Sequence, residues 1–283
     1  MSAIGVSPHA RAKSITKYVV LSVVALFWVG LPFWMLIVNS FKTSYEAATP
    51  SLALPKVWNI VANYSTVITT GQYFIGLRNS LIVAIPTVLC VLLLGAMAAW
   101  TFARSRAVSA GVMYYLMTLS ILLPAAIVPT VVLLNKTHLT TTVLGYMLAL
   151  IGTRTAVMVF LATGYIKGLP VDYEEAAQID GASRWGIFWH VILPLTRPIM
   201  FSVAIMTVIN VWNDFFFALY LLPGSQNETL PLKLYRFANS SQYSTNWNLV
   251  FAHVLLTSLP LLIVYIVLQR KVISGLTEGG VTG

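Results

Sequence analysis

The chain alternates between long apolar runs and shorter polar segments. A helix that crosses a membrane needs about 20 mainly apolar residues, because every backbone polar group must be satisfied within the helix when no water is present. Six runs reach that length, so the pattern predicts an all-α integral membrane protein with six transmembrane helices. The runs span Tyr18 to Val38, Ser80 to Phe102, Val112 to Leu134, Val143 to Gly164, Pro198 to Leu222 and Leu249 to Leu268.

Basic residues set the expected orientation of these helices. Lys and Arg are retained on the cytoplasmic side of a membrane, and six spans place both termini on one side. Of the 17 Lys and Arg, ten lie in segments on the side of the termini and six on the opposite side, while Arg154 lies within a span. Both termini are therefore expected in the cytoplasm. The predicted organisation is a tail of residues 1–17, one transmembrane domain of residues 18–268 and a tail of residues 269–283.

Small residues and prolines within the spans predict how the helices pack. On the second span Gly95, Ala99 and Ala103 recur every fourth residue, and such a stripe lets another helix backbone approach closely. Each proline inside a span removes a backbone hydrogen bond and can kink its helix. These prolines are Pro32, Pro86, Pro124, Pro129 and Pro260.

The composition agrees with a membrane protein. The chain has 283 residues, 58% of them hydrophobic and only 9% charged, against about 25% charged in an ordinary soluble domain. This composition argues against soluble enzymes and nucleic-acid-binding proteins, and the net charge of +9 is better explained by orientation in the bilayer. Cys90 is the single cysteine, so neither an intramolecular disulfide nor a zinc site built on cysteines is expected.

Four of the eight acidic residues lie in one loop, residues 165–197, between the fourth and fifth spans. Within it, the stretch from Leu169 to Gly181 begins with a proline, carries acidic residues in its first turn and ends on a glycine, a pattern typical of a short helix. Ser183 is suited to cap a second helix. The clustered acids are Asp172, Glu174, Glu175 and Asp180.

The second helix of this loop is expected to be amphipathic. Its large apolar residues follow a helical spacing of i, i+3, i+4 and i+7, which predicts a single apolar face. The loop is therefore predicted to form a helix-turn-helix at the membrane surface. The pattern alone fits equally an anchor in the lipid headgroups and a surface that docks a partner. The residues of the predicted face are Trp185, Phe188, Trp189 and Ile192.

The loop carries a sequence resemblance that the pattern does not supply. The run from Glu174 to Ser183, followed by Ile192 to Leu195, resembles the EAA signature of ABC importer permeases. Two further segments, Trp212 to Phe215 and Gly275 to Gly283, resemble motifs of the sugar-importer branch of that family, the maltose-permease type. The resemblance implies a permease subunit in a prokaryotic cell membrane that forms half of a translocation pathway for a carbohydrate.

The resemblance also implies partners and contact residues. In the family, the EAA loop docks on a separate ATPase and passes its closing motion to the membrane helices, and the glycine-rich tail reaches the ATPase as well. The implied partners are two copies of a cytoplasmic ABC ATPase, a second homologous permease and an extracytoplasmic solute-binding protein. The implied coupling residues are Glu174, Glu175, Ala176, Ala177, Asp180, Gly181, Ala182 and Ser183, and the implied tail contacts are Gly275, Glu278, Gly279 and Gly280.

Enzymatic motifs are absent from the sequence. No G-x-x-x-x-G-K-[ST] phosphate-binding loop occurs, and the four histidines are scattered without a ligand spacing. We therefore assign no catalytic residue and no metal site, and we expect no cofactor on this chain. ATP and Mg are expected on the partner ATPase.

Two charged residues fall within spans, where an unpaired charge is costly, by about 2.5–3.5 kcal/mol on insertion scales. They are Arg154 and Asp214. Together with Asn210, Trp212 and Asn213, these charges are candidates to line a translocation path for a hydroxyl-rich solute. In the alternative reading, Asp214 is paired or capped for structure alone, with Arg154 as its partner.

The segments expected outside the membrane, from Lys42 to Arg78 and from Pro223 to Trp247, are rich in Tyr, Trp, Asn and Gln. They resemble surfaces on which the family docks its binding protein, although the amphipathic stretch from Trp58 to Leu77 also fits the membrane surface. The main alternative function is a secondary transporter driven by an ion gradient. Such a transporter would normally show inverted repeats and more ionisable groups within the membrane.

Overall fold

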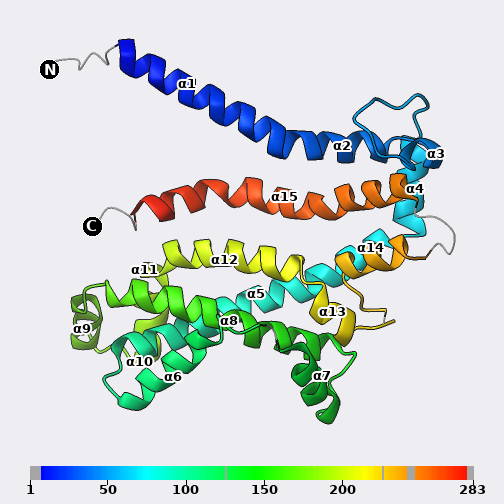
Figure 1. The fold of residues 1–283 in the computed structure, drawn as a ribbon. Helices are drawn as coiled ribbons and strands as arrows, with labels where there is room; N and C mark the ends of the chain where they lie inside the picture. The colour runs from blue at the N-terminus through cyan, green and yellow to red at the C-terminus, as the bar shows by residue number, and fades with distance from the viewer. Residues whose placement is uncertain (1–7, 125, 225, 241–245, 279–283) are drawn as a thin grey trace. The chain divides into compact units, whose positions relative to one another are not determined.

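The computed structural model describes residues 8–124, 126–224, 226–240 and 246–278, with side chains from residue 17 to residue 267 in these ranges. Every regular element in the described residues is helical, which confirms the predicted all-α fold (Figure 1). Backbone contacts divide the chain into two units. The first unit comprises Met1–Gln72 and Arg236–Leu256, and the second comprises Tyr73–Tyr235 and Thr257–Gly283.

The first unit begins with a helical segment that contains the first predicted span. The turn before Pro32 widens into a π-helix, which accommodates a residue that has no amide proton to donate. The remaining helices of this unit are short, apart from the start of the C-terminal helix. The elements are α1 (Pro8–Ala25), η1 (Leu26–Gly30), α2 (Leu31–Ser40), α3 (Ser44–Ala47), α4 (Ile60–Thr69) and the first part of α15 (Trp247–Glu278).

A buried polar cluster holds this unit together beyond the end of α2. Lys42 is only 3% exposed, and its Nζ donates to Asn39 Oδ1 at 2.9 Å and to Ser51 Oγ at 2.8 Å. The Asn63 amide donates to the backbone oxygens of Ser40 and Lys42, both at 2.8 Å. Oxygen acceptors therefore satisfy the buried ammonium group, in place of a carboxylate.

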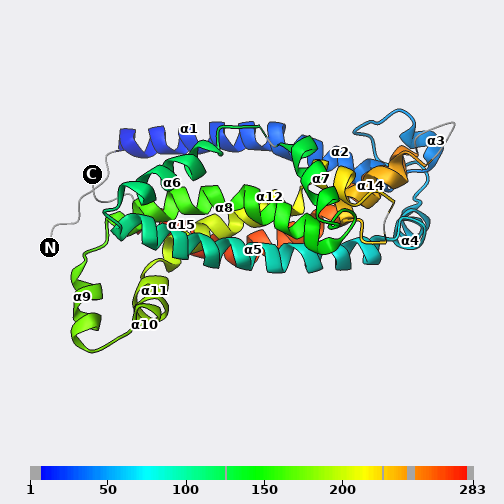
Figure 2. The ribbon, with the colours of Figure 1, turned by 90° about the horizontal axis from the view of Figure 1, so that it is seen from below.

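The second unit is built on three helices that run side by side, α5 (Tyr73–Arg104), α8 (Val143–Lys167) and α12 (Arg197–Trp212) (Figures 1 and 2). The small-residue stripe on α5 faces α8, as predicted. A Cβ atom built on Gly95 would overlap Met158 Cγ, so the glycine is what allows this approach. Ala99 is fully buried in the same contact region.

The predicted third span, Val112 to Leu134, is wrong as a continuous helix. It consists of α6 (Val108–Leu119) and α7 (Ile127–Lys136), which are separated by turns. Pro124 lies in this break. Proline donates no backbone hydrogen bond and disfavours helical geometry in the residue before it. Pro86 and Pro260 do not have this effect, because α5 and α15 continue through them.

The predicted fifth span, Pro198 to Leu222, is also interrupted. Helix α12 ends at Trp212, and α13 (Phe216–Leu221) begins only after a break around Asp214. Four described helices are long and apolar enough to cross a membrane, or five if α12 is counted with the bent segment before it. The total of six spans and the cytoplasmic location of both termini remain predictions. The four helical segments are Lys17–Ser40, Tyr73–Arg104, Val143–Lys167 and Trp247–Val267.

Candidate functional site

The acidic loop forms the predicted helix-turn-helix, which we call the coupling loop (residues 165–197). Figure 2 shows its helices projecting from one end of α5 and α8. Gly181 makes the turn with a φ of +80°, a conformation that glycine adopts without strain. Ser183 caps the second helix, since its Oγ accepts from the Gly186 amide at 3.2 Å. The elements are α9 (Asp172–Ile179), α10 (Arg184–Ile187), η2 (Phe188–Ile192) and α11 (Leu193–Leu195).

Glu174 of the signature turns inward, toward its own chain. Its side chain is 8% exposed. Oε1 accepts from Arg104 Nε at 2.7 Å, and Oε2 accepts from Trp100 Nε1 at 2.9 Å. Arg104 also donates to the backbone oxygen of Leu169 at 3.1 Å, just before α9. The geometry of Glu174 therefore suits attachment of the loop to α5, and its carboxylate is not presented to an outside partner.

The predicted single apolar face of the second helix is wrong. Phe188 and Ile192 are buried, but Trp185 and Trp189 are 62% and 46% exposed. Trp185 lies in α10, whereas Phe188, Trp189 and Ile192 lie in the π-helical turn η2, which carries more residues per turn than an α-helix, so the four side chains do not keep an ideal α-helical spacing. Ile187 joins the buried side instead. The loop thus has one face packed on its own chain and a separate exposed aromatic face.

The rest of the signature divides between these two faces. Ala177 and Ala182 are partly buried against the core formed by the ends of α5 and α8. Glu175, Ala176 and Asp180 are exposed, as is the Gly181 turn between them and Ser183. Two large apolar side chains share this exposed part of the loop, Ile179 at 86% and Tyr173 at 54% exposure. The outward surface therefore combines free carboxylates with unpacked apolar groups.

Asp214 lies in the break between α12 and α13 and is 8% exposed. Its Oδ1 accepts from the Tyr146 hydroxyl at 2.9 Å and from the Ala218 amide at 3.2 Å. Its Oδ2 lies 3.5 Å from Arg154 Nη2, which confirms the predicted pairing. The geometry supports the structural reading, because this carboxylate caps α13 and joins it to α8.

The other candidate path residues differ from Asp214 in burial and in hydrogen-bond partners. Asn210 and Asn213 are exposed, and each amide donates to a backbone oxygen four residues earlier, at 2.7 and 2.9 Å. Trp212 is buried, with Nε1 3.3 Å from the Thr257 oxygen. Both asparagines are exposed, and their role in a path remains a prediction.

The C-terminal candidates are placed only in part. Gly275 and Glu278 lie within α15, which continues ten residues past the predicted end of the last span at Leu268. Gly279 and Gly280 lie outside the described residues. A tail contact with an ATPase therefore remains a prediction.

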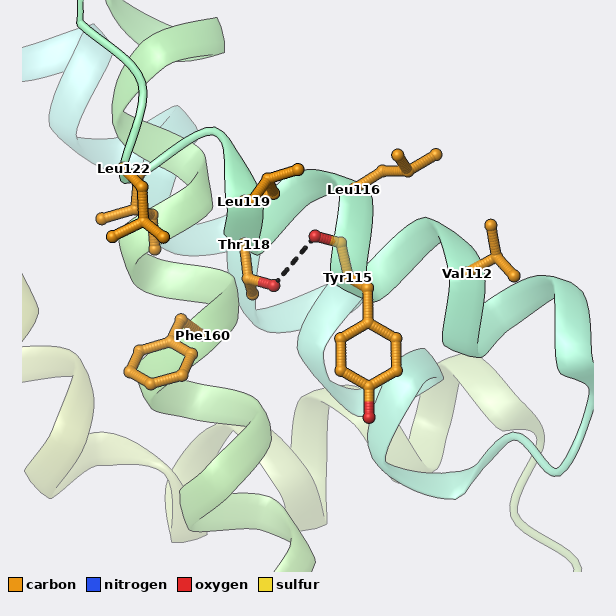
Figure 3. A pocket seen from close by; sticks show the side chains of 8 residues that line it. Val112, Tyr115, Leu116, Thr118, Leu119, Leu122 and Phe160 are labelled. Carbon is orange, nitrogen blue, oxygen red and sulfur yellow. Dashed lines mark hydrogen bonds between the residues drawn. The ribbon is translucent and has the colours of Figure 1, made fainter.

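A groove of about 600 Å³ runs along α6 and α8 (Figure 3). Its lining is almost wholly apolar, and the Thr118 hydroxyl is already bonded to the Tyr115 backbone oxygen at 3.1 Å. A hydroxyl-rich solute would find few hydrogen-bond partners there, so the groove is a poor site for a sugar. The labelled lining residues are Val112, Tyr115, Leu116, Thr118, Leu119, Leu122 and Phe160.

Sequence reasoning missed three residues of these sites, Trp100, Arg104 and Tyr146. Arg104 contributed only to the count of basic residues. Two features of the sequence could have indicated this contact. Trp100 and Arg104 have an i, i+4 spacing at the end of a span, which places both donors on one helix face. Half of the acidic residues of the chain lie in one loop, which makes that loop the main source of acceptors. Tyr146 offered no such signal, because a tyrosine within an apolar run is most often a packing residue.

Two proteins are similar to this chain in sequence along most of its length. The chain is 33% identical over 261 residues to the "Probable starch degradation products transport system permease protein AmyC" of Thermoanaerobacterium thermosulfurigenes, covering 92% of this chain and 93% of that protein. It is 31% identical to the "Diacetylchitobiose uptake system permease protein NgcG" of Streptomyces coelicolor, covering 96% and 91%.

A solved structure supports the same fold. A chain in the crystal structure of a bacterial ABC transporter involved in the import of alginate, an acidic polysaccharide, superimposes with a TM-score of 0.80 at 19% identity. The superposition covers 95% of this chain and 99% of that chain. Residues 91–276, which include the coupling loop, match a family described as "Binding-protein-dependent transport system inner membrane component". The chain belongs to this family of inner membrane transport permeases.

Proposed function

We propose that this chain is the permease subunit of an ATP-driven carbohydrate importer and forms half of its translocation pathway. The observation that carries the proposal is the structure of the coupling loop. One face of the loop packs on its own chain, and the other face exposes acidic and large apolar side chains. Exposed carboxylates beside large apolar side chains are typical of a docking surface and are unusual on a loop that only contacts water. The carbohydrate is inferred from the starch-product and diacetylchitobiose systems of the relatives.

The partners follow from the same reading. A separate ATPase, in two copies, binds ATP and Mg and docks on the coupling loop, while this chain contributes no hydrolytic group. A second, homologous permease completes the pathway, and an extracytoplasmic binding protein delivers the solute. Within the first unit, exposed aromatic side chains such as Tyr45 and Trp58, at 91% and 57%, suit contact with a protein that carries a sugar.

The first experiment is purification of the chain from its native membrane, followed by identification of the proteins that copurify. We expect an ABC ATPase in the complex, and we expect uptake into proteoliposomes to require ATP. The variant Gly181→Trp forces a bulky side chain into a turn with positive φ and should release the ATPase. Gly224→Trp, between α13 and α14, is the matched control, because Gly224 also has a positive φ, of +65°, and a Cβ there meets nothing within 4 Å.

The proposal fails if no ATPase copurifies with the wild-type chain, or if uptake ignores ATP and follows an imposed ion gradient. The latter result would instead support a secondary transporter. Isothermal titration of candidate sugars against the copurified binding protein then identifies the solute. No heat of binding with any oligosaccharide, alongside binding of another solute class, would reject the carbohydrate assignment.

A further inference from the structure

One carboxylate links the coupling loop to the last turns of α5. Trp100 and Arg104 lie four residues apart on one face of this helix, and each uses a different oxygen of Glu174, at 2.9 and 2.7 Å. Because the two donors lie one helical turn apart, they fix both the position of the carboxylate and the direction of its O–C–O plane relative to the axis of α5. We call these three residues the Glu174 clamp.

The clamp reaches both arms of the loop. Arg104 holds the entry to α9 through the Leu169 backbone oxygen at 3.1 Å. The Trp100 ring lies against Phe188 of the second arm, with ring centroids 6.0 Å apart. Two residues on a single helix face therefore contact both the start of one arm and the middle of the other.

A polar cavity of about 290 Å³ lies beside the clamp, between the end of α5 and the two arms of the loop, and its lining includes Thr101, Ser105, Gln178 and Arg184. Next to it, Ala177 of α9 packs on the apolar cluster that includes Ala99 of α5. The two bonds of Glu174 therefore add a polar, directed link to this apolar packing.

We propose that Trp100, Arg104 and Glu174 are positioning residues that make the coupling loop and α5 move as one body, so that displacement of the docked loop reaches the membrane helices. The inference rests on the proposed function, in which an ATPase docks on the exposed face of the loop. Helix α5 packs along α8 and α12, so a movement of its end is passed to the centre of the second unit.

The test uses the complete transporter in proteoliposomes and measures solute imported per ATP hydrolysed. With Glu174→Gln we expect the ATPase to stay bound and hydrolysis to continue, while uptake per ATP falls about tenfold, a typical allosteric coupling effect. Arg104→Gln should act alike, and the double variant should be no worse than either single variant. Trp100→Phe keeps the ring against Phe188 and loses only one donor, so its loss should be smaller.

Glu175→Gln is the matched control, because Glu175 is the exposed neighbour of Glu174. In that variant ATPase binding, hydrolysis and uptake should fall together, and uptake per ATP should stay constant. A ratio that is unchanged in Glu174→Gln with the ATPase bound would overturn the clamp and leave the proposed function intact. Loss of ATPase binding in Glu174→Gln would also overturn it, because the carboxylate would then act in docking.

A covalent replacement supplies a second readout. In a Cys90→Ser background, Glu174→Cys and Arg104→Cys remove the clamp and allow a short bis-methanethiosulfonate linker to rejoin the same two positions, forming a reducible disulfide with each cysteine and releasing methanesulfinate. We expect low uptake per ATP without the linker, recovery when the linker is attached and loss again after reduction. If the linker instead blocks transport, the loop and α5 must separate during the cycle, and the clamp is refuted.

Discussion

The contact between α5 and α8 makes a quantitative prediction at Gly95. An alanine Cβ at this position would overlap Met158 Cγ and lie 2.8 Å from Met158 Cβ, whereas carbon atoms in favourable contact lie about 3.5–4.0 Å apart. Met158 is fully buried, and its Cβ is fixed to the backbone of α8. Gly95→Ala therefore forces the two helices apart by about 1 Å, estimated from that contact distance.

The expected cost follows from two opposing terms. Overpacking of a close contact costs about 1–3 kcal/mol, and removal of a glycine from a helix interior returns about 0.5–1 kcal/mol. Gly152→Ala in α8 is the matched control, since its new Cβ meets nothing within 4 Å and only the favourable term applies. The difference between the two variants is the overpacking term itself, about 1–3 kcal/mol.

The assay is thermal unfolding of the purified transporter in one detergent at one scan rate. For a chain of this size 1 kcal/mol corresponds to about 2–4 °C. We expect Gly95→Ala to melt several degrees below Gly152→Ala and slightly below the wild type. If both variants melt together, α5 and α8 do not approach as closely as the structure indicates, and the packing role of the small-residue stripe is refuted.

Three further predictions concern single contacts. Tyr146→Phe removes a donor to the buried Asp214 carboxylate and should cost about 1.5–3 kcal/mol in thermal unfolding. Asp214→Asn leaves Arg154 without its carboxylate partner within a span, so it should cost more, about 2.5–3.5 kcal/mol, and the reverse order would refute the assigned geometry. Ser183→Ala removes the cap of α10, worth about 1 kcal/mol, and amides of α10 should exchange about fivefold faster in hydrogen-exchange mass spectrometry. Unchanged exchange would mean that the hydroxyl does not cap this helix.

The fold was predictable from the sequence where the signal is local. Apolar length identified the helical segments, and proline, glycine and serine positions identified the two arms of the coupling loop. The close contact at Gly95 was also readable, because a stripe of small residues has one main use in a membrane helix. These features depend on a few neighbouring residues, so no knowledge of the rest of the chain was needed.

The errors share a different cause. The sequence predicted a possible kink near Pro124 and not a break in the helix. The break at Asp214 was not predicted, because the amide of Ala218 and the hydroxyl of Tyr146 reach this carboxylate only in the folded chain. Trp185 in α10 and Trp189 in the π-helical turn that follows are both exposed, which the apolar spacing alone did not predict. In each case competition between local geometry and tertiary contacts decided the outcome.

The sequence by itself determined that this chain is a helical membrane protein with an acidic helix-turn-helix between its fourth and fifth apolar segments. Only the tertiary structure decided what the acids of that loop do. Glu174 and Glu175 are adjacent and chemically identical, yet one is buried against Arg104, 70 positions earlier, and the other faces outward. The physical reason is that a carboxylate's role depends on which donors surround it, and those donors come from a distant part of the chain.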